Sequence, residues 1–314
     1  RYVDQITRYA PETTQYTTFS WRKAFTRRYD IIHFHWPEFL LRHSTRRGRL
    51  RRRFRFLALL AWLRLRGVAI VRTLHNAEPH ETGDGIERFL LTMLERQTDL
   101  FIRLNPFTNV PGDKPAVTIP HGDYREAFDR YPRYPRVRGR ILFAGKLRGY
   151  KGIDQLLTVF HAIDDASVSL RIVGQPQDTS VMRQVEAVAA IDPRISSVYG
   201  FVPDEYLVKE LSEAELVVLP YPNMHNSGIL FAALTVGTTV LVPSNDVNRW
   251  LASEVGPGWV CMYRDRLTAG DIRDALRAMA DAASPSVPQM ANRSWHTIAE
   301  QHATAYCALR HDRA

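Results

Sequence analysis

Short apolar runs alternate with helix-like segments along the whole chain, and this alternation restricts the fold more than any other feature. Runs such as VAIVRTLH (68–75) and RILFAG (140–145) have the length and composition of buried strands. Between the runs, apolar residues recur at helical spacing, as in 85–98 and 152–163. A strand–helix–strand succession predicts parallel sheets with helices on both faces. The fold class is therefore α/β. The other expected strands are 31–36, 100–105, 116–122, 169–174, 195–200, 215–221 and 238–244, and the other expected helices are 50–66, 178–190, 204–212 and 227–236.

A segment rich in Pro and Arg, 129–139, divides these elements into two series. With 314 residues, the chain is long enough for two ordinary α/β domains. We therefore expect two Rossmann-like domains, 1–137 and 138–290, that face each other across a cleft. A last helix is expected within 291–314, and the sequence leaves open whether it stays with the second domain or crosses back to the first.

Cysteine content and hydropathy restrict the setting of the protein. Cys261 and Cys307 are the only cysteines, so no disulfide framework is expected and a reducing, cytoplasmic setting is favoured. No run of about 18 uncharged apolar residues is present, so we expect no membrane-spanning helix. No signal-peptide pattern is found either, although the sequence begins with Arg1 and not with methionine.

The net charge of +9 is unevenly distributed. Residues 1–137 hold 25 Lys and Arg against 14 Asp and Glu, whereas residues 138–314 hold 17 against 19. Most of the excess lies in residues 42–66, which carry ten arginines and no acidic residue. This asymmetry predicts an anionic partner for the first half of the chain.

The arginine-rich segment 42–66 has three interpretations. As an amphipathic helix it would lie on an anionic membrane surface. Its arginines would also suit nucleic-acid phosphates, but the stacked aromatics of single-strand binding modules have no counterpart here, so nucleic acid is not favoured as a partner. The third interpretation is a solvated surface helix with a stripe that faces the core. The apolar face expected from the spacing consists of Leu50, Phe54, Leu57, Leu60, Ala61 and Leu65.

The segment FAGKLRGYKG (143–152) reads as a strand end, a glycine-rich loop and the start of a helix. Lys146 and Lys151 lie in the loop, and a helix N-terminus would add backbone N–H groups. Together these features are typical of a phosphate site. A solvated basic loop would have the same composition.

The longer segment FAGKLRGYKGIDQLLTVF (143–160) resembles the start of the nucleotide-sugar domain of GT-B glycosyltransferases of the group 1, family 4-like type. The resemblance continues through LRIVGQP (170–176), VYGFVPDEYLVKELSEAELVVLPY (198–221) and NSGILFAALTVGTTVLVP (226–243). In the first half, YDIIHFHWPE, TLHNAEPHE and IPHG stand where such enzymes place their acceptor-side loops. The HNAEPHE and NSG loops are most similar to those of bacterial mannosyltransferases that build exopolysaccharide repeat units on a lipid carrier, which implies GDP-mannose as the donor, with a UDP-sugar as the alternative.

One loop departs from the family pattern. Many retaining members carry two glutamates around their donor loop, but HNSGILFAAL (225–234) has no acidic residue. The retaining mechanism of those members therefore cannot be assigned to this chain directly. Whether the reaction inverts or retains the configuration of the sugar stays open. The same departure favours an alternative, a non-catalytic protein of this fold that binds a nucleotide sugar or a polyanion.

The resemblance implies a donor site in the second domain that works without a metal or other cofactor. Basic side chains and a helix dipole would neutralise the leaving diphosphate in place of a metal ion. The opposing interpretations are an ordinary N-cap for the NSG turn and core packing for the aromatic residues. The predicted donor-binding residues are Gly145, Lys146, Lys151, Gln175, Phe201, Val202, Tyr221, Asn226, Ser227, Gly228 and Ile229. Of these, Phe201 and Val202, in the turn that begins with Gly200, and Tyr221 are expected to form the base pocket, with Gln175 at the same edge of the sheet.

The first domain would hold the acceptor and a base that deprotonates its hydroxyl group. His75 matches the usual cleft histidine of the superfamily and is ranked first, followed by Glu78, Glu81 and Glu38. Polar residues directly after parallel strands point to the ligand-binding edge of a sheet. The histidine spacing matches no standard zinc signature, so no metal is expected. The sequence thus predicts a hexosyltransferase at the inner face of the membrane that acts on a lipid-linked or glycan acceptor.

Overall fold

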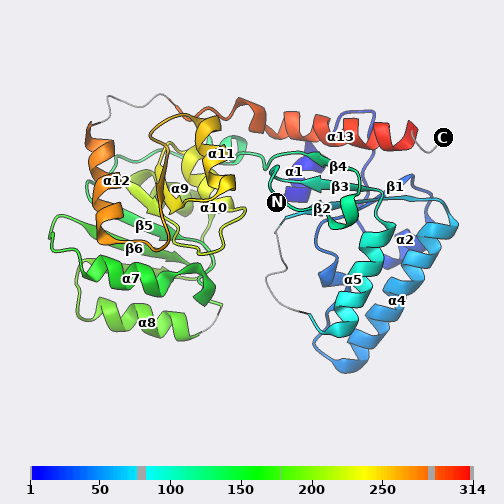
Figure 1. Ribbon diagram of the computed structural model, residues 1–314, viewed down its shortest axis with the longest axis horizontal. Helices are drawn as coiled ribbons and strands as arrows, with labels where there is room; N and C mark the ends of the chain where they lie inside the picture. The colour runs from blue at the N-terminus through cyan, green and yellow to red at the C-terminus, as the bar shows by residue number, and fades with distance from the viewer. Residues whose placement is uncertain (1, 76–82, 178, 282–286, 312–314) are drawn as a thin grey trace. The chain divides into compact units, whose positions relative to one another are not determined.

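The computed structural model describes residues 2–75, 83–177, 179–281 and 287–311 (Figure 1). The chain forms two compact units: unit 1 comprises residues 1–122 and 292–314, and unit 2 comprises residues 123–291. Each unit is built on one parallel sheet. The α/β class expected from the sequence is confirmed.

Unit 2 begins at Asp123, earlier than the expected boundary at residue 137, because residues 123–137 pack on it. Phe128 is fully buried in the core of unit 2. The backbone N–H of Tyr124 donates to Oγ1 of Thr235 at 3.1 Å. Within the segment rich in Pro and Arg, the Val137 N–H donates to the Glu213 carbonyl oxygen at 2.8 Å, so this segment is part of a folded unit and not a free linker.

Unit 1 contains a four-stranded sheet with the order β1-β2-β3-β4 among its described residues. The strands are β1 (Ile31–Phe34), β2 (Ala69–Leu74), β3 (Leu100–Arg103) and β4 (Ala116–Thr118). All of them are parallel, so their carboxyl ends meet at one edge of the sheet. His35, His75 and His121 follow β1, β2 and β4 and lie along this edge.

Helices cover both faces of the first sheet, as Figure 1 shows for α1 and α13 on one side and α4 and α5 on the other. Successive side chains of a strand face opposite sides. Ile70 thus belongs to the cluster of Phe56 and Leu94, whereas Val71 belongs to the cluster of Ile6 and Ile298. The C-terminal helix, for which the sequence left two placements, packs in unit 1. The helices of unit 1 are α1 (Tyr2–Arg8), α2 (Trp21–Thr26), α3 (Glu38–Leu41), α4 (Arg46–Leu65), α5 (Gly85–Gln97), the 3-10 turn η1 (Pro111–Asp113) and α13 (Trp295–His311), with η3 (Ala291–Arg293) at the junction.

Helix α4 has two apolar faces where the sequence analysis expected one. Its core face consists of Phe56, Leu59, Leu60 and Leu63, all fully buried. The other apolar side chains are exposed, with exposed fractions of 70% for Leu50, 73% for Phe54, 37% for Leu57 and 82% for Leu65. Of the expected face, only Leu60 is in the core, because the spacing grouped it with residues that point the other way. No helix in the described part of the chain is both long enough and apolar enough to cross a membrane.

Unit 2 contains a six-stranded parallel sheet with the order β10-β9-β8-β5-β6-β7 among the described residues. The strands are β5 (Arg140–Ala144), β6 (Ser169–Gly174), β7 (Ile195–Tyr199), β8 (Leu216–Val218), β9 (Thr239–Pro243) and β10 (Val260–Tyr263). The chain runs outward from β5 to β7, returns to β8, and then runs outward in the other direction. The order of strands therefore reverses between β5 and β8, which is the topological switch point where open α/β sheets bind ligands.

Figure 1 shows α7 and α8 on one side of the second sheet and α9 and α10 on the other. The inner strands β5, β6, β8 and β9 are largely buried on both faces, as parallel strands in this architecture are. The helices of unit 2 are α6 (Arg125–Phe128), the 3-10 turn η2 (Gly149–Lys151), α7 (Ile153–His161), α8 (Thr179–Ala189), α9 (Asp204–Glu213), α10 (Gly228–Thr235), α11 (Asp246–Val255) and α12 (Ala269–Asp281).

Candidate active site

Two loops converge at the switch point of unit 2. The loop after β5 carries Gly145, Lys146 and Lys151, and the loop after β8 carries Tyr221 and residues 226–229. A Cβ atom on Gly145 would lie 3.1 Å from Cγ1 of Ile229 and 3.7 Å from Nζ of Lys151. The structure therefore brings together residues from both segments that the sequence predicted to bind the donor.

Glycine is required where the loops cross. Gly174 ends β6 with a φ of 157°, and a Cβ atom there would lie 1.7 Å from the carbonyl oxygen of Gly145. Gly152 precedes α7 with a φ of 68°, and its Cβ atom would lie 2.2 Å from the carbonyl oxygen of Pro220. Side chains at these positions would push the loops apart, so glycine keeps the loops after β5, β6 and β8 in contact.

Lys151 is held against Tyr221. Its Nζ donates to the Tyr221 hydroxyl oxygen at 3.2 Å and lies 4.6 Å from the centroid of the ring. Burial, with the nearby charges of Arg148 and Lys146, lowers the pKa of Lys151 to about 8. An anion at this site would counter both effects, because it favours the charged form of the ammonium group. Lys146, by contrast, is exposed.

The N-terminus of α10 presents backbone N–H groups next to these cations. Ser227 is the N-cap residue and is buried, but its side chain makes no capping hydrogen bond to the helix. The first N–H groups of a helix need an acceptor, and an anion can supply it. Gly228 follows, where a Cβ atom would lie 2.8 Å from the hydroxyl oxygen of Tyr124. Asn226 precedes this turn and is half-buried.

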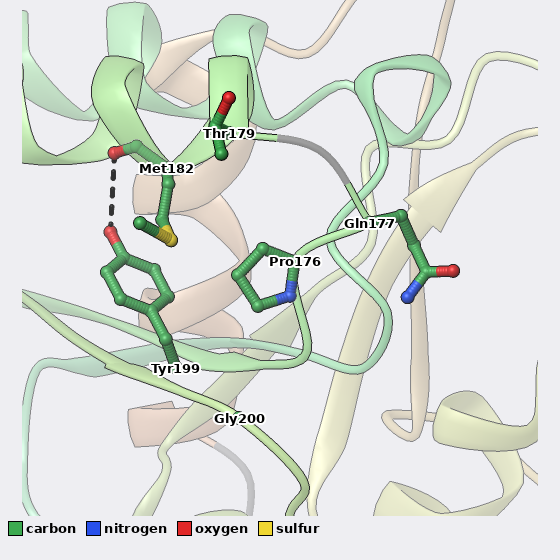
Figure 2. Close-up of a pocket in the computed structure, with 6 residues that line it drawn as sticks. All are labelled: Pro176, Gln177, Thr179, Met182, Tyr199 and Gly200. Atoms are coloured by element: carbon green, nitrogen blue, oxygen red, sulfur yellow. Dashed lines mark hydrogen bonds between the residues drawn. The ribbon is translucent and has the colours of Figure 1, made fainter.

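A pocket of about 380 Å³ lies beside the ends of β6 and β7 (Figure 2). The hydroxyl of Tyr199 donates to the backbone oxygen of Met182 at 3.5 Å across it. The Leu147 N–H donates to the Gln175 carbonyl oxygen at 2.9 Å. This bond joins the loop after β5 to the residues that follow β6 and lead to the pocket. The residues that line the pocket are Pro176, Gln177, Thr179, Met182, Tyr199 and Gly200.

The predicted base-binding residues have different positions relative to this pocket. Gly200 lines it, and Gln175 directly precedes the lining residue Pro176. Phe201 follows Gly200 and is 77% exposed, so it is not a core residue, and Val202 is half-buried. Tyr221 is buried beside Lys151 and does not line the pocket.

A cluster of aromatic and histidine rings occupies the carboxyl edge of the first sheet. Nδ1 of His35 and Nε2 of His75 are 3.1 Å apart and share a hydrogen bond. The His75 ring stacks on Trp36 with a centroid distance of 4.2 Å and an interplanar angle of 16°. Tyr2 meets His35, His75 and His302 edge to face. The predicted base thus lies in a packed group of rings from both ends of the chain.

The histidines of this cluster are held in the neutral form. Burial, followed by the proximity of the other imidazoles, lowers the pKa of His33 and His75 well below the usual value. The same causes lower the pKa of His35 to about 3. Burial also lowers the pKa of His121 and of His302 to about 4. A neutral imidazole has the lone pair that accepts a proton.

Of the other candidates for the base, the structure describes only Glu38. Glu38 is the first residue of α3, and no hydrogen bond of the described residues joins its carboxylate to the histidines. Glu78 and Glu81 lie outside the described residues. Within the described ranges, no three His, Cys, Asp or Glu residues are placed to hold a metal ion.

Several site residues were missed in the sequence analysis. Trp36, which stacks on His75, and Tyr2, which packs against it, come from separate segments. Tyr124 lies between the expected strand 116–122 and the segment 129–139, where no element was expected. Trp36 directly follows His35 at a strand end, so its position was a usable signal, whereas nothing in the sequence places Tyr2 near His75.

Comparison with known proteins identifies the family of the chain. The profile of the family described as glycosyl transferases group 1 matches residues 132–270. Two curated relatives from Xanthomonas campestris pv. campestris, both named GDP-mannose:glycolipid 4-beta-D-mannosyltransferase, are 40% and 39% identical to this chain over 307 residues. Each match covers 97% of this chain and 87% of the relative.

Solved structures give the same fold at low identity. Sucrose-phosphate synthase from Thermosynechococcus elongatus has a TM-score of 0.64 at 19% identity, covering 90% of this chain and 74% of that one. The Anabaena protein Alr3699/HepE, solved in complex with UDP-glucose, has a TM-score of 0.63 at 13% identity, covering 89% and 79%. Both have the GT-B fold, as expected from the sequence. With near-complete coverage by relatives at 40% identity, the chain belongs to the group 1 glycosyltransferases and is a glycosyltransferase of the GT-B fold.

Proposed function

We propose that this enzyme transfers a mannosyl group from GDP-mannose to the hydroxyl group of a glycolipid acceptor and forms a β-linkage. The observation that carries the proposal is the 40% identity, over 97% of the chain, to a GDP-mannose:glycolipid 4-beta-D-mannosyltransferase. The sugar of GDP-mannose is α-linked, so a β-product requires inversion. Inversion by a single displacement needs a base on the acceptor hydroxyl and no protein nucleophile, which agrees with the absence of acidic residues from residues 225–234.

The donor diphosphate would bind at the switch point of unit 2. As the bond between C1 and the diphosphate oxygen breaks, the electron pair leaves with GDP and adds negative charge there. The Lys151 ammonium and the backbone N–H groups at the start of α10 are placed to stabilise this charge. Lys146 adds a second cation from the same loop. No metal ion is needed in this scheme.

The pocket beside Tyr199 and Gly200 suits the guanine base. A planar base binds in an apolar slot with polar groups at its edge. Pro176 and Met182 supply apolar surface, and Gln177 and Thr179 supply polar groups (Figure 2). Phe201 follows the lining residue Gly200 in the sequence, and its exposed ring would add aromatic surface for the base.

His75 is the proposed base on the acceptor side. It would take the proton of the acceptor hydroxyl while the oxygen attacks C1 of mannose, and His35 would hold the ring through its hydrogen bond of 3.1 Å. Because both pKa values are lowered, the imidazoles are neutral at pH 7 and are ready to accept a proton. Glu78, Glu81 and Glu38 rank behind His75 as candidates for the base.

We further propose that unit 1 lies on the cytoplasmic face of an anionic membrane, where a glycolipid acceptor resides. The exposed face of α4 combines Leu50, Phe54, Leu57 and Leu65 with exposed arginines on either side, including Arg47 and Arg51. An interfacial helix has this combination of large apolar side chains and flanking positive charges. Phe39 of α3 and Phe89 of α5, two helices that pack against α4, are 63% and 61% exposed and extend the apolar surface.

A thermal-shift panel with GDP-mannose, GDP, UDP-glucose and UDP tests the donor assignment. A ligand that binds only the folded protein stabilises it by about 2.7 kcal/mol at 100 times its Kd. We expect GDP-mannose and GDP to raise the Tm and the uridine nucleotides to leave it unchanged. A Tm shift with UDP-glucose alone would assign UDP-glucose as the donor in place of GDP-mannose. A failure to transfer mannose from GDP-mannose to any glycolipid would overturn the proposed reaction.

A further inference from the structure

Tyr221 touches both anion-binding elements of the donor site. Its side chain is buried, with an exposed fraction of 7%. On one side, its hydroxyl oxygen accepts a hydrogen bond from Lys151 Nζ at 3.2 Å, and its ring lies 4.6 Å from the same nitrogen. On the other side, burial raises the pKa of Tyr221, and the side chain of Ser227, the N-cap residue of α10, is near enough to the hydroxyl group to offset part of this shift.

The contacts of Tyr221 restrict the direction in which Lys151 can act. An ammonium group has three N–H donors, and the one aimed at Tyr221 leaves two for other acceptors. The ring supports the positive charge by a cation–π interaction, so the lysine stays charged although it is largely buried. The hydroxyl group, by contrast, sets the rotation of the ammonium group. Charge and direction therefore depend on different parts of the same side chain.

The surrounding backbone fixes the position of this pair. Gly145 leaves room for the lysine, since a Cβ atom there would lie 3.7 Å from Nζ. Pro220 precedes Tyr221 and its carbonyl oxygen is pressed against Gly152, the residue after Lys151. The loops that carry the lysine and the tyrosine thus cannot shift independently.

We propose that Tyr221 is a positioning residue that aims the Lys151 ammonium at the leaving diphosphate and keeps it in register with the N-terminus of α10. This role rests on the proposed function, which places the diphosphate at that point. From the sequence, Tyr221 was expected at the nucleotide base, whereas its contacts with Lys151 assign it to the phosphates.

The test separates the hydroxyl group from the ring. In Tyr221→Phe the cation–π contact is kept and only the hydrogen bond is removed. The Kd of GDP is measured by calorimetry from pH 6.5 to 9.5, together with kcat and KM for GDP-mannose. The matched control is Tyr263→Phe, which removes the hydroxyl group of another buried tyrosine of unit 2, on β10.

For the wild type, GDP affinity should fall above about pH 8, where Lys151 loses its proton. In Tyr221→Phe this fall should begin about half a pH unit to one unit lower, because the charged form of Lys151 no longer has the hydrogen bond from its ammonium group to the Tyr221 hydroxyl oxygen. We expect kcat to fall about tenfold with a smaller change in KM, since aim matters most as charge develops. Tyr263→Phe should follow the wild type in all three measurements.

Three different results would overturn the inference or its basis. If Tyr221→Phe matches the wild type in kcat and in the pH dependence of GDP binding, the positioning role is wrong although the site stands. If Lys151→Ala binds GDP with unchanged affinity, the diphosphate does not bind at this lysine and the proposed site is wrong. A loss of stability without a shift in the pH dependence would also contradict positioning.

Discussion

Burial is the main cause of the neutral state of His75, and its packing among aromatic rings provides that burial. Its ring is stacked on Trp36, meets Tyr2 edge-on and shares a hydrogen bond with His35. None of these neighbours carries a negative charge that would favour the imidazolium form. Such a base is available over the whole neutral range, but it is a weaker base than a free histidine.

Replacement of His75 by Ala should leave donor binding intact and reduce transfer by about 10²–10⁴-fold, the usual contribution of a positioned base. GDP-mannose binding by calorimetry and mannosyl transfer to glycolipid measure the two effects. Because the pKa of His75 is lowered, wild-type kcat should not fall between pH 7.5 and 6.5. His296→Ala, on the exposed face of α13, is the control. Full transfer activity in His75→Ala would exclude this residue as the base.

The order of strands and helices followed from the sequence because apolar runs and helical spacing are local signals. The expected strands from 31–36 to 238–244 correspond to β1–β9. The expected elements did not include β10, whose four residues VCMY include a half-buried and an exposed side chain, or the short helices α1, α2, α3 and α6. Two longer helices, α11 and α12, were also missed, although both are amphipathic. In α4 the helical pattern was visible in the sequence, but the face that would be buried was not, because two apolar stripes lie on one helix.

Helix α4 provides a prediction at this scale. Leu50→Ser with Phe54→Ser should weaken binding to vesicles that contain phosphatidylglycerol, because apolar area no longer enters the interface. Arg47→Glu with Arg51→Glu should weaken it about tenfold or more, since each basic residue near an anionic surface contributes about 1 kcal/mol. Co-sedimentation with anionic and neutral vesicles measures both.

Ile191→Ser, at a residue of unit 2 that is 70% exposed, controls for the loss of an exposed apolar side chain. Neither double variant changes a residue of the core face, so the fold should persist. Equal sedimentation of the wild type and both double variants with anionic vesicles would contradict docking through α4.

At the scale of the whole molecule, the two units differ in their histidines with lowered pKa values, of which the described part of unit 2 holds His225. His33, His35, His75, His121 and His302 all belong to unit 1. His302 is fully buried, and its Nε2 has no hydrogen-bond partner among the described residues. The sequence showed the histidines at strand ends, but it did not indicate that α13 would add His302 to them, because that contact joins distant parts of the chain.

Acid should therefore destabilise unit 1 before unit 2. The folded pKa values are lower than the unfolded value of about 6.5, so the unfolded state binds more protons and stability falls as the pH drops below 6.5. For His302, with a folded pKa of about 4, the loss at pH 5 is about 2 kcal/mol. Hydrogen exchange at pH 7.5 and 5 measures the local stability of each unit. In His302→Gln the loss in unit 1 should be smaller, and equal losses in both units would contradict the assignment.

The return of α13 to unit 1 also sets the order in which the two units are completed during synthesis. Residues 123–291 are contiguous, so the ribosome delivers every strand of unit 2 before it reaches Trp295. Unit 1 is then still without the helix that covers Val71 and Ile102. In the nascent chain, the side of its sheet that α1 and α13 cover together stays partly open, with apolar side chains exposed, until α13 emerges. Synthesis of unit 1 thus begins before that of unit 2 and ends after it.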